Sequence, residues 1–389
     1  MKNEPKIRIK GFEGEWKELS FNNLFSLVSD YKSNIGNKTD YQEEGKYPII
    51  DQSKEYIVGY TNEDNPIIPD NGIIVFGDHT REIKYIDFPF YTGADGTKLL
   101  HCQQSVFPLF GYYSCCSQRI PNTGYNRHYK FLKEADYIIP SLPEQRTIAT
   151  YFRHIDSLIE TADKKIASLK QVKEASLQSM FPKEGQKVPE VRFKGFEGEW
   201  KTSKLSTFAK RVTRKNGNLE TELPVTISSQ DGIIAQTQFF NNVVASSNLR
   251  GYYLIKKGEF AYNKSYSNGY PYGSVKRLEK YDMGALSTLY IVFALSKDID
   301  HDYVIYFFET MLWHNEVAMR AAEGARNHGL LNIGADDFLD IQTIVPPTLS
   351  EQRKIASFFV HLDKQIAIAQ QRLDLLRRIK SACLDEMFV

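Results

Sequence analysis

Two long segments of the chain show a regular alternation of apolar and polar positions. In each, apolar residues return at alternating steps of four and three, a period typical of helices that pack along one another as a coiled coil. We expect each segment to form a helix of about 40 residues, roughly 60 Å long. The predicted seams are Ile148, Phe152, Ile155, Ile159, Ile166 and Leu169 in the first segment and Ile355, Phe359, Leu362, Ile366, Leu373 and Leu376 in the second.

A helix with one apolar stripe is marginal when it is isolated. We therefore expect the two stripes to cover each other, and the alternative is that each stripe packs on its own globular domain. Lys173 and Lys380 interrupt the two stripes at the same register, and such a polar interruption can fix the pairing of two helices. Ser141 with Glu144 and Thr348 with Glu351 have the spacing of a capping box at the two helix starts.

The chain is an internal duplication. The block from Pro143 to Phe181 aligns with the block from Ser350 to Phe388 at an offset of 207, and the sequence GFEGEWK occurs at Gly11–Lys17 and again at Gly195–Lys201. A repeat of this kind decides the architecture. It predicts a globular domain at residues 1–140, a central helix at 141–184, a second globular domain at 185–346 and a C-terminal helix at 347–389.

The short connection after the first helix predicts its direction relative to the second. Only the nine residues Pro182–Glu190 separate the first helix from the second copy of the repeat. Because the ends of a domain usually lie close together, the second helix must run back along the first. We expect an antiparallel pair with one domain at each end, and the N-terminal segment beside the end of the second helix.

The two globular blocks carry short apolar runs between Gly, Pro, Asn and Asp, which is typical of strands. Four such runs are Tyr47–Asp51, Gly72–Phe76, Tyr290–Leu295 and Ile341–Pro346. The chief helical candidate is Asp302–Arg320. The fold class predicted for each domain is therefore mixed α/β (α+β) with more strand than helix, and the whole is pseudo-twofold.

Each domain carries two loop clusters that combine hydrogen-bond donors with aromatic residues or glycine. Side chains of these types contact base edges and phosphates in DNA complexes. In each domain one cluster lies mid-block and the other lies shortly before the long helix. The predicted DNA-binding residues are His79, Thr80, Arg81 and Lys84, then Asn122, Tyr125, Arg127 and His128, then Asn263, Lys264, Ser265, Tyr266, Tyr270 and Tyr272, and finally Arg326, Asn327 and His328.

Composition narrows the class of protein only modestly. Apolar residues make up 42% and charged residues 25% of the chain, which is typical of a globular protein. The net charge of +1 argues against a wholly basic nucleic-acid-binding coat, although local basic patches remain compatible with it. The absence of a long apolar run and of a signal-peptide pattern predicts a cytoplasmic protein with no membrane contact.

Motifs for chemistry are scarce. The chain has no nucleotide-binding phosphate loop, no Gly-x-Gly-x-x-Gly sequence and no Asn-Pro-Pro-aromatic motif, so nucleotide hydrolysis and base methylation are not expected. The four cysteines have no Cys-x-x-Cys spacing, and no metal site is predicted. One alternative is a metal-dependent nuclease built on Asp78, Glu82 and Lys84.

The chain resembles the DNA-specificity subunit of Type I restriction–modification enzymes over essentially its whole length. The segments that carry the resemblance are the doubled Gly11–Lys17 and Gly195–Lys201, the doubled Glu144–Ala149 and Glu351–Ala356, and the stretches Val75–Leu100, Ala261–Phe293 and Glu323–Phe338. The resemblance implies two target-recognition domains that each read one half of a split sequence in double-stranded DNA. It also implies that the helices hold these domains apart.

The same resemblance implies partners. Two methyltransferase subunits, which carry S-adenosylmethionine, would dock on the helices, and motor-nuclease subunits would use ATP and magnesium. This chain is expected to hold no cofactor and to be non-catalytic. Two alternatives stay open: a coiled-coil scaffold whose domains bind peptides or glycans, and the self-contained nuclease.

Overall fold

The computed structural model describes residues 4–28, 38–93, 96–240, 248–321 and 331–388. The chain divides into two compact units. Unit 1 comprises Met1–Lys164 and Gln370–Val389, and unit 2 comprises Lys165–Ala369. Across the described ranges, we find no helix that combines the length and apolar content needed to cross a membrane.

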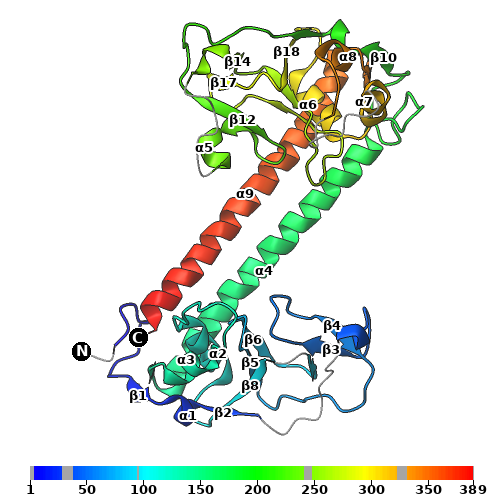
Figure 1. Ribbon diagram of the computed structural model, residues 1–389. Coiled ribbons are helices and arrows are strands. Elements are labelled where there is room, and N and C mark those ends of the chain that lie inside the picture. Colours follow the sequence, from blue (N-terminus) through cyan, green and yellow to red (C-terminus); the bar gives the residue numbers. More distant parts are fainter. Residues whose placement is uncertain (1–3, 29–37, 94–95, 241–247, 322–330, 389) are drawn as a thin grey trace. The chain divides into compact units, whose positions relative to one another are not determined.

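Two long helices each contribute to both units. Helix α4 spans Leu142–Ser179 and helix α9 spans Leu349–Met387, so they contain 38 and 39 residues. The prediction of two helices of about 40 residues is therefore confirmed. Both are unbroken in Figure 1.

Within each unit the two helices run antiparallel. In unit 1, Asp156 of α4 pairs with Lys380 of α9, and the later Asp163 pairs with the earlier Arg377. All twelve predicted seam residues are buried or half-buried: Ile148, Phe152, Ile155, Ile159, Ile166, Leu169, Ile355, Phe359, Leu362, Ile366, Leu373 and Leu376. The stripe at the start of each helix also packs on its own domain, since Phe152 and Phe359 each belong to the main core of the domain that precedes their helix.

The termini of the duplicated segments lie where the repeat predicts. In unit 1 the backbone N–H of Ile7 donates to the carbonyl oxygen of Glu386, near the end of α9, at 3.0 Å. In unit 2 the N–H of Val191 donates to Ser179, at the end of α4, at 2.9 Å. The expectation that the N-terminal segment lies beside the end of the second helix is thus confirmed.

Unit 1 contains a sheet of order β2–β8–β5–β6, a smaller sheet of order β4–β3–β7 and the pair β1–β9. Strand β3 is antiparallel to β4 and parallel to β7. The strands are β1 Lys17–Leu19, β2 Phe25–Leu27, β3 Tyr47–Ile50, β4 Gly59–Thr61, β5 Ile73–Gly77, β6 Ile83–Ile86, β7 Tyr91–Thr92, β8 Thr97–Cys102 and β9 Tyr137–Ile139. The helical elements are α1 Phe21–Leu24, η1 Lys38–Asp40, α2 Pro108–Ser117 and α3 Tyr129–Glu134.

Unit 2 repeats this topology with an additional edge strand, β14. Its sheets have the orders β11–β18–β15–β16 and β13–β12–β17–β14, and β10 pairs with β19. The strands are β10 Lys201–Lys204, β11 Ala209–Arg211, β12 Pro224–Ser228, β13 Gly232–Ala235, β14 Tyr253–Lys256, β15 Phe260–Asn263, β16 Ser274–Arg277, β17 Met283–Leu286, β18 Ile291–Leu295 and β19 Gln342–Val345. The helical elements are η2 Leu205–Thr207, α5 Gln236–Phe239, η3 Leu249–Gly251, α6 His301–Glu309, α7 His314–Arg320 and α8 Ala335–Leu339.

The four-stranded sheet of unit 1 is covered on both faces, which explains its continuous apolar runs. Along β5, Ile74 and Phe76 belong to the core that includes the long helix, whereas Ile73 and Val75 belong to the core under the smaller sheet. This alternation follows from the two-residue period of a strand. Figure 1 shows α2 beside β5 and β6, where it packs.

The single helix predicted over Asp302–Arg320 is wrong in one respect. The structure divides this segment into α6 and α7, with a break that begins at Thr310. The hydroxyl of Thr310 donates to the carbonyl oxygen of Phe307 at 2.7 Å and accepts the N–H of Leu312 at 3.3 Å. Because a threonine hydroxyl can replace the backbone hydrogen bonds of a helix, the helix ends there.

Candidate nucleic-acid interface

An arginine just before each GFEGEWK segment anchors its domain to the start of the domain's own long helix. The Arg8 guanidinium donates to both carboxylate oxygens of Glu144, at 2.8 and 2.9 Å, and to the carbonyl oxygen of Gly14 at 2.7 Å. Arg192 binds Glu351 in the same way at 2.7 and 2.9 Å. Hydrogen bonding to Glu144 raises the pKa of Arg8, as expected of a charge-assisted fork.

These forks correct the capping-box interpretation. The hydroxyl of Thr348 does accept the N–H of Glu351 at 3.2 Å. The carboxylates of Glu144 and Glu351, however, bind arginine rather than their own cap residues, since a bidentate arginine pair is stronger than a bond to a backbone N–H.

The glutamine that follows each of these glutamates also holds its domain. The side-chain oxygen of Gln145 accepts the N–H of Phe107, just before α2, at 2.8 Å. The side-chain oxygen of Gln352 accepts the N–H of Asp300, just before α6, at 2.8 Å. Sequence reasoning missed this role, although the doubled Glu-Gln dipeptide was the signal for it.

A lysine, an aspartate and a tyrosine connect both long helices to the domain in each unit. In unit 1, Asp156 binds Lys380 at 2.6 Å and the hydroxyl of Tyr113 at 2.8 Å. Tyr113 lies on α2, so one carboxylate joins α4, α9 and the domain. Burial and the Asp156 carboxylate raise the pKa of Tyr113.

Unit 2 contains the same three groups. Asp363 binds Lys173 at 2.7 Å and the hydroxyl of Tyr306, on α6, at 2.8 Å. Lys173 also pairs with Glu309 at 2.7 Å. Although burial opposes the charge, these two carboxylates raise the pKa of Lys173. The doubled lysine predicted to fix helix pairing therefore also contacts a domain tyrosine in each unit.

We call these contacts between each domain and the long helices, made by the arginine forks, the glutamines and the lysine–aspartate–tyrosine groups, the frame. On this frame, the structure brings the two predicted loop clusters of unit 1 together. His79, in the turn between β5 and β6, stacks on Tyr125 of the second cluster with ring centroids 4.6 Å apart and planes 7° apart. Tyr125 is 86% exposed, and Asn122 and Arg127 are exposed beside it. Arg81 has a φ of 67°, in the left-handed region that residues with a side chain rarely adopt. Thr80, also exposed, donates to the carbonyl oxygen of Gln52.

Two predicted residues of unit 1 lie inside the domain instead. The ammonium group of Lys84 donates to the carbonyl oxygens of Asp51 and Glu55, and burial lowers its pKa. The ring of His128 is fully buried and lies against the backbone of Asp78. In this geometry both residues support the loops rather than face solvent.

The nuclease arrangement is not assembled. Asp78 is buried, and its carboxylate accepts the N–H of Tyr129 at 2.8 Å, while Lys84 is bound to backbone carbonyls of another loop. Among the residues that the structure describes, no group of three or more His, Cys, Asp or Glu side chains is placed to hold a metal ion.

In unit 2 the mid-block cluster occupies the equivalent turn, between β15 and β16. Asn263 accepts the N–H of Ser265 at 3.0 Å, and Tyr262 donates to the carbonyl oxygen of Tyr272 at 2.7 Å, so the ends of the turn are fixed. Tyr266 is exposed, whereas Tyr270 and Tyr272 are half-buried. Arg326, Asn327 and His328 lie outside the described residues.

Sequence reasoning missed a third segment, which lies beside the first cluster of unit 1 and the mid-block cluster of unit 2. Gln52 follows β3, and its side-chain oxygen accepts the N–H of His79 at 3.1 Å. In unit 2, Ser229 follows the equivalent strand β12 and shares hydrogen bonds with Ser267 and Ser274 at 3.0 and 3.1 Å. Only the three-dimensional pairing of the two sheets brings these segments to the clusters.

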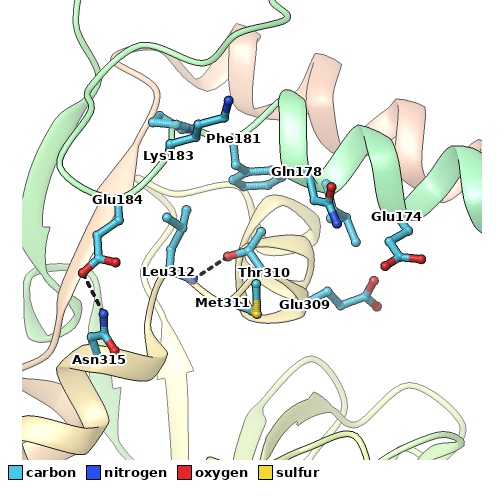
Figure 2. Close-up of a pocket in the computed structure, with 12 residues that line it drawn as sticks. Glu174, Gln178, Phe181, Lys183, Glu184, Glu309, Thr310, Met311, Leu312 and Asn315 are labelled. Carbon is cyan, nitrogen blue, oxygen red and sulfur yellow. Dashed lines mark hydrogen bonds between the residues drawn. The ribbon is translucent and has the colours of Figure 1, made fainter.

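A pocket of about 480 Å³ lies in unit 2 between the end of α4 and the segment after α6. Figure 2 shows Glu184 bound to Asn315, and the side chains of Glu309 and Met311 at its lining. Glu309 already pairs with Lys173.

Comparisons with known proteins agree with this geometry. A family model described as the Type I restriction modification DNA specificity domain matches residues 13–171. Searching the curated proteins by sequence gave no match.

Three solved structures match this chain over most of its length. A Type I restriction–modification S subunit from M. genitalium has 16% identity and a TM-score of 0.62 and covers 99% of both chains. A chain from a study of complex assembly in a type I R-M system has 12% identity and a TM-score of 0.48 and covers 96% of this chain and 97% of its own. The HsdS subunit from Thermoanaerobacter tengcongensis has 13% identity and a TM-score of 0.43 and covers 96% of both.

The first of these structures shows the fold, because its similarity extends over nearly all of both chains. Together with the match to the family model, it confirms the resemblance that the doubled segments predicted. Residues 13–171 therefore belong to the family of Type I restriction modification DNA specificity domains, and the chain as a whole has the fold of a Type I restriction–modification S subunit.

Proposed function

We propose that this chain is the non-catalytic specificity subunit of a Type I restriction–modification enzyme and recognises an asymmetric, two-part sequence in double-stranded DNA. The observation that carries the proposal is the duplicated placement of unlike loops. Each unit presents a β-hairpin turn and a loop before a short helix at equivalent positions of the same topology. Because the loops differ in sequence, each unit would read a different half of the target.

Exposed and buried loop residues would have different roles in this recognition. Tyr125, Arg127 and Tyr266 are exposed and carry groups that stack on bases or bind phosphates. Lys84 and His128 are buried and would support the loops that carry these groups. With a net charge of +1, affinity would depend on local contacts, and it would fall with salt in proportion to the phosphates bound.

The long helices would dock two methyltransferase subunits that supply S-adenosylmethionine. These subunits would in turn bind motor-nuclease subunits, which use ATP and magnesium. The assembly would act on cytoplasmic DNA. The duplication supports two docked methyltransferase subunits, since the frame contacts of Arg8 and Glu144 recur at Arg192 and Glu351.

The deciding experiment maps methylated positions in DNA from cells with and without this chain. We expect a two-part motif that disappears when the chain is absent. Replacing Tyr125 with Ala should relax one half of the motif and leave the other half unchanged. A methylation pattern that does not depend on the chain would contradict the proposed function.

A further inference from the structure

The two loop clusters of unit 1 meet at one buried residue, Asp78, which directly follows β5 and is 2% exposed. Its N–H donates to the carbonyl oxygen of Gly96 at 2.7 Å, and its own carbonyl oxygen accepts the N–H of His128 at 2.7 Å. Its carboxylate accepts the N–H of Tyr129 at 2.8 Å. Asp78 thus connects three segments that are distant in sequence.

We propose that Asp78 is a positioning residue for DNA recognition, which holds the β5–β6 turn and the loop before α3 in one arrangement without touching DNA itself. The proposal rests on the proposed function and extends it to a residue that cannot read a base. A buried carboxylate needs a hydrogen-bond donor to offset its desolvation, and here the donor belongs to the second cluster. Any movement of that loop away from the turn would leave the charge unpaired.

The ring of His128 reinforces the same connection. Its Nδ1 lies 3.0 Å from the carbonyl oxygen of Asp78, which can only accept, so Nδ1 carries the proton. Nε2 is then an acceptor, and it faces the hydroxyl of Thr123 at 3.2 Å. The ring therefore joins the β5–β6 turn to the loop that carries Tyr125.

The exposed surface depends on this connection. His79 belongs to the turn and Tyr125 to the loop, so their stacking requires the two segments to keep their places. The packing around them leaves little freedom. A Cβ atom on Gly96 would lie 2.8 Å from both the Gln52 side chain and the His79 ring.

Unit 2 makes the same connection with a different side chain. Lys264 directly follows β15, as Asp78 follows β5, and its carbonyl oxygen accepts the N–H of Leu331 at 2.9 Å. Its ammonium group donates to the carbonyl oxygen of Ile333 at 3.4 Å. Leu331 and Ile333 precede α8 as His128 precedes α3. The shared backbone bond indicates that joining this turn to the segment before the short helix is a property of the fold, not an accident of one loop.

The test compares Asp78→Ala with Asp78→Asn, whose amide oxygen can still accept the N–H of Tyr129. Asp87→Ala is the matched control, because it removes a carboxylate from the same unit that pairs with Arg153 and lies beyond the other end of β6. The full chain selects duplexes from a random DNA pool, and the bound duplexes are sequenced. In parallel, amide hydrogen exchange without DNA reports on residues 77–82 and 121–129.

We expect Asp78→Ala to lower the base preference in one half of the motif about tenfold, as loss of one buried charged hydrogen bond allows. It should also speed exchange in both segments together. Asp78→Asn and Asp87→Ala should keep both halves and the slow exchange. Unchanged preferences in Asp78→Ala, or equal loss in both halves, would overturn the positioning role. A wild-type chain without any base preference would overturn the proposed function as well.

Discussion

Units 1 and 2 share their frame and differ in their loops. The frame contacts recur one for one, from the arginine forks at Glu144 and Glu351 to the tyrosine hydroxyls on Asp156 and Asp363. The turns and loops over the sheets have unrelated sequences, yet they occupy equivalent positions. This division lets the loops change without altering how a domain is held on the helices.

The frames also differ in two details, and each detail gives a prediction. In unit 2 the indole N–H of Trp200 donates to Glu351 at 3.2 Å. In unit 1 the indole nitrogen of Trp16 is buried and has no hydrogen-bond partner among the described residues. The second detail is Glu309, which gives Lys173 a second carboxylate, whereas Lys380 has one within ion-pair distance in the described part of the chain.

The largest effect is expected from removing the carboxylate under the arginine fork. Glu351→Ala should lower the free energy of unfolding of unit 2 by about 3 kcal/mol, because it strands Arg192 and the indole N–H of Trp200. Glu144→Ala leaves only Arg8 without its carboxylate, and it should lower the free energy of unfolding of unit 1 by about 2 kcal/mol. Amide hydrogen exchange along β15 and β5 measures the two units separately. Glu351→Gln, which keeps an acceptor, is the control, and equal losses in both units would refute the role of the indole.

A smaller difference is expected at the aspartates that join the helices to the domains. Asp156→Ala leaves Lys380 without a carboxylate and should cost about 1.5 kcal/mol, whereas Asp363→Ala leaves Lys173 paired with Glu309 and should cost about 0.5 kcal/mol. Exchange in the helices of each unit measures both. Tyr113→Phe and Tyr306→Phe remove one hydroxyl from each unit and serve as the matched pair. A cost for Asp363→Ala as large as that for Asp156→Ala would show that Glu309 does not compensate.

Alkaline pH should affect the two units differently, since all four cysteines lie in unit 1. Burial raises the pKa of Cys102 to about 12. Its contribution to stability is therefore complete below the pKa of an unfolded thiol, near 8.5, and is lost as pH rises toward 12. At pH 9 unit 1 should have lost about 1 kcal/mol through Cys102.

Each unit also has a lysine that acts in the opposite direction. Burial lowers the pKa of Lys84 in unit 1 and of Lys276 in unit 2, so both units gain stability as these groups lose their protons. Because thiols begin to lose their protons in the unfolded chain between about pH 8 and 10, removing one thiol isolates its part of the difference between the units. Cys102→Ala should reduce that difference in hydrogen-exchange stabilities, and an unchanged difference would contradict the assignment.

The sequence predicted the long helices and their pairing well, because these parts of the chain are duplicated and have a regular apolar period. The 3.5-residue period and the repeated segments indicated both helices, their direction and the strands such as β3 and β18. The pattern did not predict α2, because this helix is buried over most of its surface and lacks the polar face that gives a helical period. Composition alone also could not separate His128 from Tyr125, since their exposure depends on contacts with Asp78 and His79.

The smallest change in stability is expected from the exposed tyrosines of the two reading surfaces. Tyr125 lies in the loop before α3 and Tyr266 in the turn between β15 and β16. Both side chains are exposed, so replacing either with Ala should change the free energy of unfolding by less than about 0.5 kcal/mol. Each replacement should still weaken binding to one half of the target, by roughly 1–3 kcal/mol if the ring stacks on a base. Binding to duplexes altered in one half or the other separates the two variants. If Tyr125→Ala and Tyr266→Ala weaken the same half, the units do not read independently, and the shared frame would be serving a single composite surface.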